Sequence, residues 1–199
     1  VRFVAFMVVI IAFLLFLLFR RISGVILPLL VVGPAVSGTI GSMAIAGEYL
    51  SAPSQILPSL ILAVGIGAAV HILTIFFQRL DDGESREDAI AHAMGHSGLP
   101  VCMTSITTAA GLLSFITAEI DPVSVIGIFA PIGIALALIY CLVLLPALLA
   151  VIPLKNRVRQ TPNGNESHGS GVIGDTLVAV GDFSIRHARA MVVATALVL

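Results

Sequence analysis

The sequence has 199 residues, of which 58% are hydrophobic and only 11% are charged, and its mean hydropathy is +1.12. Soluble globular domains carry about 25% charged residues, so this composition excludes an ordinary water-soluble protein. The formal net charge is -1 and Trp is absent, which excludes the basic surface and the aromatic platform of a nucleic-acid-binding protein. The composition therefore indicates membrane lipid as the main partner.

Five apolar stretches are long enough to cross a bilayer as helices, and a sixth begins near the C-terminus. A bilayer core of about 30 Å needs about 20 residues per helix, because each residue rises by about 1.5 Å. The stretches cover approximately residues 3–19, 25–46, 56–77, 99–118 and 123–152, and the sixth covers 188–199. The sequence therefore predicts an all-α, polytopic bundle of transmembrane helices over residues 1–153.

Three more polar segments connect or follow these stretches. Residues 78–98 combine charged residues with apolar ones at helical spacing, which predicts a short amphipathic helix against the membrane surface. Residues 154–174 are rich in Gly, Ser and Asn and predict a flexible linker. Residues 175–199 predict an interfacial helix followed by the start of the next span.

The basic residues occur in alternate connections, and this pattern predicts the orientation. Arg20 and Arg21 follow the first stretch, Arg79 and Arg86 follow the third, and the remaining basic cluster follows the fifth. By the positive-inside rule, the connections at 78–98 and 153–187 are cytoplasmic, and the first span runs inward through the cell (inner) membrane. An inward first span without an initiator Met suggests an internal piece of a larger membrane protein.

Polar residues within the apolar stretches are the first candidates for function, because they are costly in lipid. His71 lies in the third stretch, with Gly65, Gly67 and Ala68 about a turn earlier. Such small residues allow another helix to approach closely. An imidazole titrates near neutral pH and suits a proton relay, but a structural histidine bonded to a neighbouring helix fits the pattern as well.

The fourth stretch carries a cluster of hydroxyl side chains. Thr104, Thr107, Thr108 and Gly111 fall on one helical face, with Ser105 alongside and Gly111 as a further packing position. Together with His71, these hydroxyls could form a polar core or line a water-filled path between helices. Alternatively, each hydroxyl bonds a carbonyl oxygen one turn back in its own helix.

Nothing in the sequence indicates an enzyme, a metal site or a cofactor. His92 and His96 have the spacing of a metal-binding pair, but no third ligand accompanies them. No nucleophile occurs with a base and an orienting group. We therefore expect no catalytic activity, no metal and no cofactor.

Four motifs in order resemble a known membrane domain. GIGAAVHIL, QRLDDGESREDAIAHAMGHSGLPV, TSITTAAGLLSFITAEIDP and LVLLPALLAV are similar to the resistance-nodulation-division (RND) superfamily, in its lipid-exporter-like MMPL branch, which also resembles the sterol-sensing domain. The resemblance runs from the second to the start of the seventh span of a twelve-span architecture. It implies an exporter that uses the proton-motive force to move lipid-like or hydrophobic substrates, with homo-oligomer formation left open.

One departure from the family pattern concerns proton coupling. The family usually has an acidic residue shortly after the Gly pair and before the His, and Ala68 stands there in this sequence. The twelve spans of the family form two similar repeats of six. His71 could replace the acidic residue, the other repeat could carry the proton, or this repeat could be structural. The alternative function is a sensor or scaffold membrane domain that resembles the sterol-sensing domain and does not transport.

Overall fold

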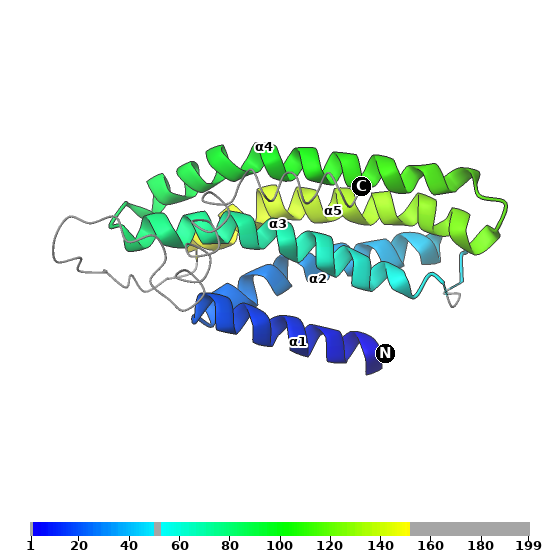
Figure 1. The fold of residues 1–199 in the computed structure, drawn as a ribbon, viewed down its shortest axis with the longest axis horizontal. Coiled ribbons are helices and arrows are strands. Elements are labelled where there is room, and N and C mark those ends of the chain that lie inside the picture. Colours follow the sequence, from blue (N-terminus) through cyan, green and yellow to red (C-terminus); the bar gives the residue numbers. More distant parts are fainter. Residues whose placement is uncertain (1, 50–52, 152–199) are drawn as a thin grey trace, which may run out of the picture. The chain divides into compact units, whose positions relative to one another are not determined.

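The computed structural model describes residues 2–49 and 53–151, and it describes side chains from Phe6 onward. These residues form five α-helices and a short 3-10 helix, with no strand among them (Figure 1). The α-helices are α1 (Arg2–Phe19), α2 (Ser23–Ile45), α3 (Ile56–Asp81), α4 (Arg86–Leu113) and α5 (Asp121–Val151), and the 3-10 helix is η1 (Ser114–Thr117). The predicted linker at 154–174 and the predicted interfacial helix at 175–199 lie outside the described residues.

Most of the helices have the length of membrane spans. By length and composition, α2, α3, α5 and the combined α4–η1 segment can each cross a membrane, and the apolar part of α1, Phe6–Phe19, is shorter. The predicted all-α bundle of membrane helices is therefore confirmed.

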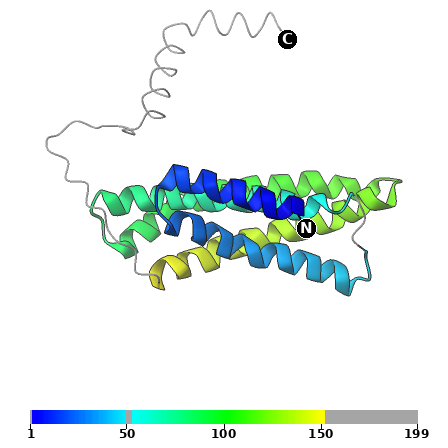
Figure 2. The same ribbon diagram turned by 90° about the horizontal axis from the view of Figure 1, so that it is seen from below.

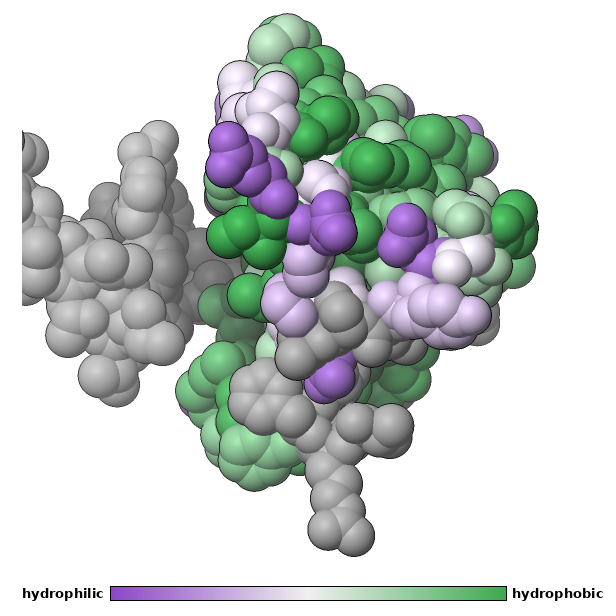
Figure 3. Space-filling model, turned by 90° about the vertical axis from the view of Figure 1, so that its right-hand side faces the viewer, coloured by the Kyte–Doolittle hydropathy of each residue, from purple (hydrophilic) through white to green (hydrophobic). Residues whose placement is uncertain are grey.

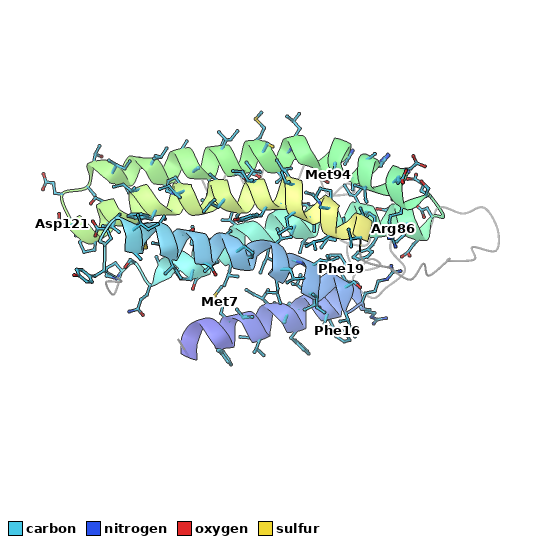
Figure 4. The ribbon with its side chains drawn as sticks, turned by 180° about the vertical axis from the view of Figure 1, so that it is seen from behind. Met7, Phe16, Phe19, Arg86, Met94 and Asp121 are labelled. Atoms are coloured by element: carbon cyan, nitrogen blue, oxygen red, sulfur yellow. The ribbon has the colours of Figure 1, made fainter. Side chains whose placement is uncertain are left out.

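Helices α3 and α5 form the centre of the bundle. Helix α5 contacts α2, α3 and α4, and α3 also contacts α1, α2 and α4, whereas α2 and α4 do not touch each other. Figures 1 and 2 show α1 and α2 diverging from the connection that joins them. Arg86 and Asp121, at the starts of α4 and α5, lie at opposite ends of the bundle (Figure 4). We call these the α3–α4 end and the α2–α3 end, after the connections that they contain.

The two ends differ in charge. At the α2–α3 end, hydrophilic side chains gather between hydrophobic flanks (Figure 3). The charged residues described in the connections there are Glu48, Glu119 and Asp121, all of them acidic. The α3–α4 end has acidic residues too, but it also contains Arg20, Arg21, Arg79 and Arg86.

The core consists of apolar side chains from α2, α3 and α5. Ile72, Leu73 and Phe76 of α3 are fully buried, as are Val31 and Val32 of α2. Because lipid tails are as apolar as these side chains, close packing rather than release from water holds such helices together. A Cβ atom on Gly65 would lie 2.9 Å from Val32 Cγ2, so this glycine sets the spacing of α2 and α3.

Helix α4 corrects one prediction. The polar stretch at 78–98 is not a separate surface helix, because α3 extends to Asp81 and α4 then runs unbroken through Pro100. Helix α4 buries residues at a spacing of four, namely Ala89, Ala93, Ser97 and Val101. This contact stabilises the helix, and Pro100 removes one backbone hydrogen bond without ending it.

Ser85 caps the start of α4. Its Oγ accepts a hydrogen bond from the Asp88 backbone N–H at 3.2 Å and donates to Asp88 Oδ2 at 2.6 Å. We expect Ser85→Ala to destabilise the protein by about 1 kcal/mol, because the first turn loses a partner for its N–H. Thermal unfolding followed by circular dichroism in detergent measures this effect.

Ser114→Ala is the control for the cap, because this exposed hydroxyl only donates to Gly111 O within its own chain segment. Equal melting temperatures for Ser85→Ala and the wild type would show that the cap contributes nothing.

Candidate functional site

An open cleft of about 500 Å³ lies between α3 and α4. Its α3 wall consists of Ala63, Val64, Gly67, Ala68, His71 and Ile75. Its α4 wall consists of His96, Ser97, Pro100, Val101, Thr104, Ser105 and Thr108. The predicted polar residues His71, Thr104, Ser105 and Thr108 therefore share one cavity, whereas Thr107 is exposed on α4 outside its lining.

The predicted packing residues divide between two environments. Gly65 is buried against α2, with Ala137 of α5 also close by, and Ala68 is half-buried at the edge of the core. A Cβ atom on Gly67 or Gly111 would meet no atom within 4 Å. Among the described helices, only Gly65 of these three glycines is required by a close helix contact, and Gly67 instead widens the cleft.

The threonine hydroxyls of the cleft bond to their own helix. Thr104 Oγ1 donates to Pro100 O at 3.0 Å, and Thr108 Oγ1 donates to Thr104 O at 2.7 Å. Outside the lining, Thr107 Oγ1 bonds in the same way to Met103 O at 2.9 Å. Of the two alternatives for these hydroxyls, the structure has the local carbonyl bonds. Their oxygen lone pairs remain free to accept hydrogen bonds from within the cleft.

His71 projects from α3 on the side opposite the core. Beyond Ile56 at its start, the exposed positions of α3 follow one stripe of small and polar residues, Ala63, Gly67, His71, Thr74 and Gln78. The exposed side chains of α1 are large and apolar instead, as Phe6, Phe13 and Leu17 illustrate. The apolar surface of α1 is suited to contact with lipid tails, whereas the exposed stripe on α3 is suited to contact with water or protein.

No described side chain forms a hydrogen bond or an ion pair with His71, so its ring nitrogens are available to the cleft. The described residues also contain no group of three His, Cys, Asp or Glu residues that could hold a metal ion. What the cleft offers is an imidazole beside hydroxyl and carbonyl oxygens. Such groups accept and donate protons or bind water.

The fold and this cleft define a multi-pass α-helical membrane protein with a polar cavity between two of its helices. The MMPL family model matches residues 2–167, and the chain belongs to the MMPL family.

Several curated proteins are similar to the chain. A membrane protein of Methanocaldococcus jannaschii, MJ1562, is 30% identical over 73% of the chain and 39% of that protein. The hopanoid transporter HpnN of Burkholderia multivorans is 28% identical over 88% of the chain and 19% of that protein. HpnN of Rhodopseudomonas palustris is 25% identical over 62% of the chain and 14% of that protein. The chain thus spans well under half the length of these relatives, and no solved structure matches it.

Proposed function

We propose that this chain forms part of an RND-type transporter that moves lipid-like or other hydrophobic molecules across the cell (inner) membrane, driven by the proton-motive force. Membership of the MMPL family and the similarity to two hopanoid transporters support transport and a lipid-like substrate. The observation that supports the role of protons is the α3–α4 cleft, in which a histidine and hydroxyl groups line one cavity between two membrane helices.

In this proposal, the arginine-containing α3–α4 end faces the cytoplasm. Arg20, Arg21, Arg79 and Arg86 lie at that end, and the positive-inside rule places such residues on the cytoplasmic side. Within the cleft, His71 then lies about 15 Å from the cytoplasmic turn, since it precedes the last residue of α3, Asp81, by ten positions.

Protonation of His71 would act by changing how α3 and α4 pack. A charged imidazole attracts water and repels apolar neighbours, so it favours an open cleft over a closed one. A membrane pH gradient would bias this equilibrium, and the lipid-like substrate would move as the helices change their packing.

The decisive experiment measures export by the full-length protein in proteoliposomes with an imposed pH gradient and a hopanoid as the transported probe. We expect His71→Ala to reduce proton-driven flux at least tenfold, because the cleft loses its proton-accepting group on α3. Thr74→Ala is the matched control, since Thr74 is exposed on the same face and its hydroxyl only bonds Val70 O. Unchanged flux in His71→Ala would refute the proton role.

A sensor or scaffold domain without transport is the second candidate. The observation that favours it is the absence of acidic residues from α2 and from α3 before Asp81, including Ala68 at the family's usual acidic position. The same proteoliposomes separate the two functions, because a sensor that binds the hopanoid produces no flux even when the pH gradient is imposed.

A further inference from the structure

The connection between α1 and α2 contains two neighbouring arginines with different surroundings. The Arg21 guanidinium bonds the Asp81 carboxylate of α3 at 2.6 and 2.8 Å and lies over the Phe77 ring. The Arg20 side chain is exposed, and among the described residues it has no hydrogen-bond or ion-pair partner. Arg21 therefore holds the connection to α3, whereas Arg20 presents its charge at the surface.

The other two arginines of the α3–α4 end have partners within the protein. Arg79 pairs with Glu84 at 3.1 Å, and Arg86 donates a hydrogen bond to the Ala150 carbonyl oxygen of α5 at 3.2 Å. Of the four arginines at this end, Arg20 alone therefore has a side chain without a partner in the described part of the chain.

Arg20 ends α1 in a backbone conformation that usually selects glycine. Its φ is 49°, and it is the only non-glycine residue with a positive φ among the described residues. Its N–H donates to Phe16 O at 2.8 Å, which closes the last turn of α1. A left-handed residue at this place is most often Gly, because a Cβ atom crowds the following carbonyl oxygen. An arginine here keeps a charged side chain at some cost to the backbone.

Exposed apolar side chains flank Arg20 in the chain. Leu17 and Leu18, in the last turn of α1, and Ile22, just before α2, are each more than half exposed. Phe16 is exposed as well, and Figure 4 shows it at the α3–α4 end of the bundle. Such side chains are more stable against lipid chains than against water. This surface therefore combines one cation with an apolar patch.

The length of α2 places Arg20 just outside the hydrocarbon core of a bilayer. Helix α2 has 23 residues, none of them charged, and is therefore about 34 Å long. The hydrocarbon core is about 30 Å thick, and the polar headgroups lie just beyond it. Because Arg20 precedes the first residue of α2 by three positions, its guanidinium lies at the level of the lipid phosphates.

We propose that Arg20 and the exposed apolar side chains beside it bind a phospholipid with an anionic headgroup. The guanidinium bonds two phosphate oxygens with its planar fork, and Leu17, Leu18 and Ile22 contact the acyl chains. In phosphatidylcholine a quaternary ammonium offsets the attraction between the phosphate and the arginine, whereas phosphatidylglycerol keeps a net negative charge. This lipid site lies outside the α3–α4 cleft and does not depend on transport.

Native mass spectrometry of the full chain in detergent, titrated with phosphatidylglycerol or phosphatidylcholine, measures the site. We expect the wild type to bind its first phosphatidylglycerol about fivefold more tightly than phosphatidylcholine, which is the usual contribution of one basic residue near anionic lipid. Arg20→Gly is the sharpest variant, because glycine suits the positive φ and only the charged side chain is lost. Its phosphatidylglycerol affinity is expected to fall about fivefold, while its melting temperature stays the same or rises.

Arg79→Gln is the matched control, since it removes a charge at the same end that already has a partner, and it is expected to keep the preference for phosphatidylglycerol. Equal phosphatidylglycerol affinities of the wild type and Arg20→Gly would overturn the site. Arg20→Gln keeps the test valid if the glycine variant fails to fold. Displacement of the bound lipid by an equal concentration of glycerol phosphate would also overturn it, because that soluble headgroup has no acyl chains.

Discussion

Gly127→Ala is expected to lower the free energy of unfolding by about 2 kcal/mol. Gly127 is buried in α5, and a Cβ atom there would lie 2.6 Å from the Ile116 backbone N and 2.7 Å from the Phe115 carbonyl C. These atoms belong to the backbone of η1, so no side chain can rotate away to make room. Overpacking of this kind costs about 1–3 kcal/mol, which outweighs the gain of up to about 1 kcal/mol from replacing a helical glycine by alanine.

Gly41→Ala is the matched control for this effect. Gly41 also lies inside a helix, but a Cβ atom there would meet nothing within 4 Å. We expect this variant to melt at the same temperature as the wild type or slightly higher, because alanine favours the helix. If Gly127→Ala were as stable as Gly41→Ala in thermal unfolding by circular dichroism, η1 would not be held against α5 as described.

Asp81→Ala is expected to destabilise the protein by about 2–3 kcal/mol. Two hydrogen bonds, at 2.6 and 2.8 Å, join the Arg21 guanidinium to the Asp81 carboxylate across the α3–α4 end, and the guanidinium lies 5.1 Å from the Phe77 ring centroid. The two side chains are only 15% and 30% exposed. Removing one partner of a buried pair costs about 3–5 kcal/mol, and partial exposure reduces that value.

A double-mutant cycle measures this pair directly. Arg21→Ala, Asp81→Ala and the double variant give the coupling energy from their thermal stabilities. Glu84→Ala is the control, since its pair with Arg79 is local, longer at 3.1 Å and more exposed. We expect that control to change stability by less than about 0.5 kcal/mol. A coupling energy near zero for Arg21 and Asp81 would show that other contacts hold the α1–α2 connection to the end of α3.

The helical class followed directly from the sequence, but one helix boundary did not. Long apolar stretches determine a bundle of membrane helices because lipid offers no partner for unpaired backbone groups. The start of α4 was missed because residues 78–98 are polar and the apolar stretch begins only at residue 99. Local composition could not show that the side chains of Ala89 and Ala93 are buried against neighbouring helices. This burial lets the helix that begins at Arg86 continue into the apolar stretch.

The candidate site was only partly accessible to sequence reasoning. His71 and the threonines stood out because polar residues are rare in such stretches, and the structure places His71, Thr104 and Thr108 in one cleft. Their functional role stays a prediction. His96 was treated as one half of a weak metal pair, since the predicted surface helix separated it from the span. Its equal spacing from the short turn, ten residues like that of His71, was the signal that could have identified it.

The sequence by itself indicated the membrane environment, the helical class and the family resemblance, because these depend on composition and on short local motifs. The tertiary structure alone decided which polar residues share a cavity, which glycines are needed for packing and which arginine holds the helices together. Those properties depend on distances between residues far apart in the chain, as the 60 positions between Arg21 and Asp81 illustrate. Helix packing sets such distances, and no local pattern encodes them.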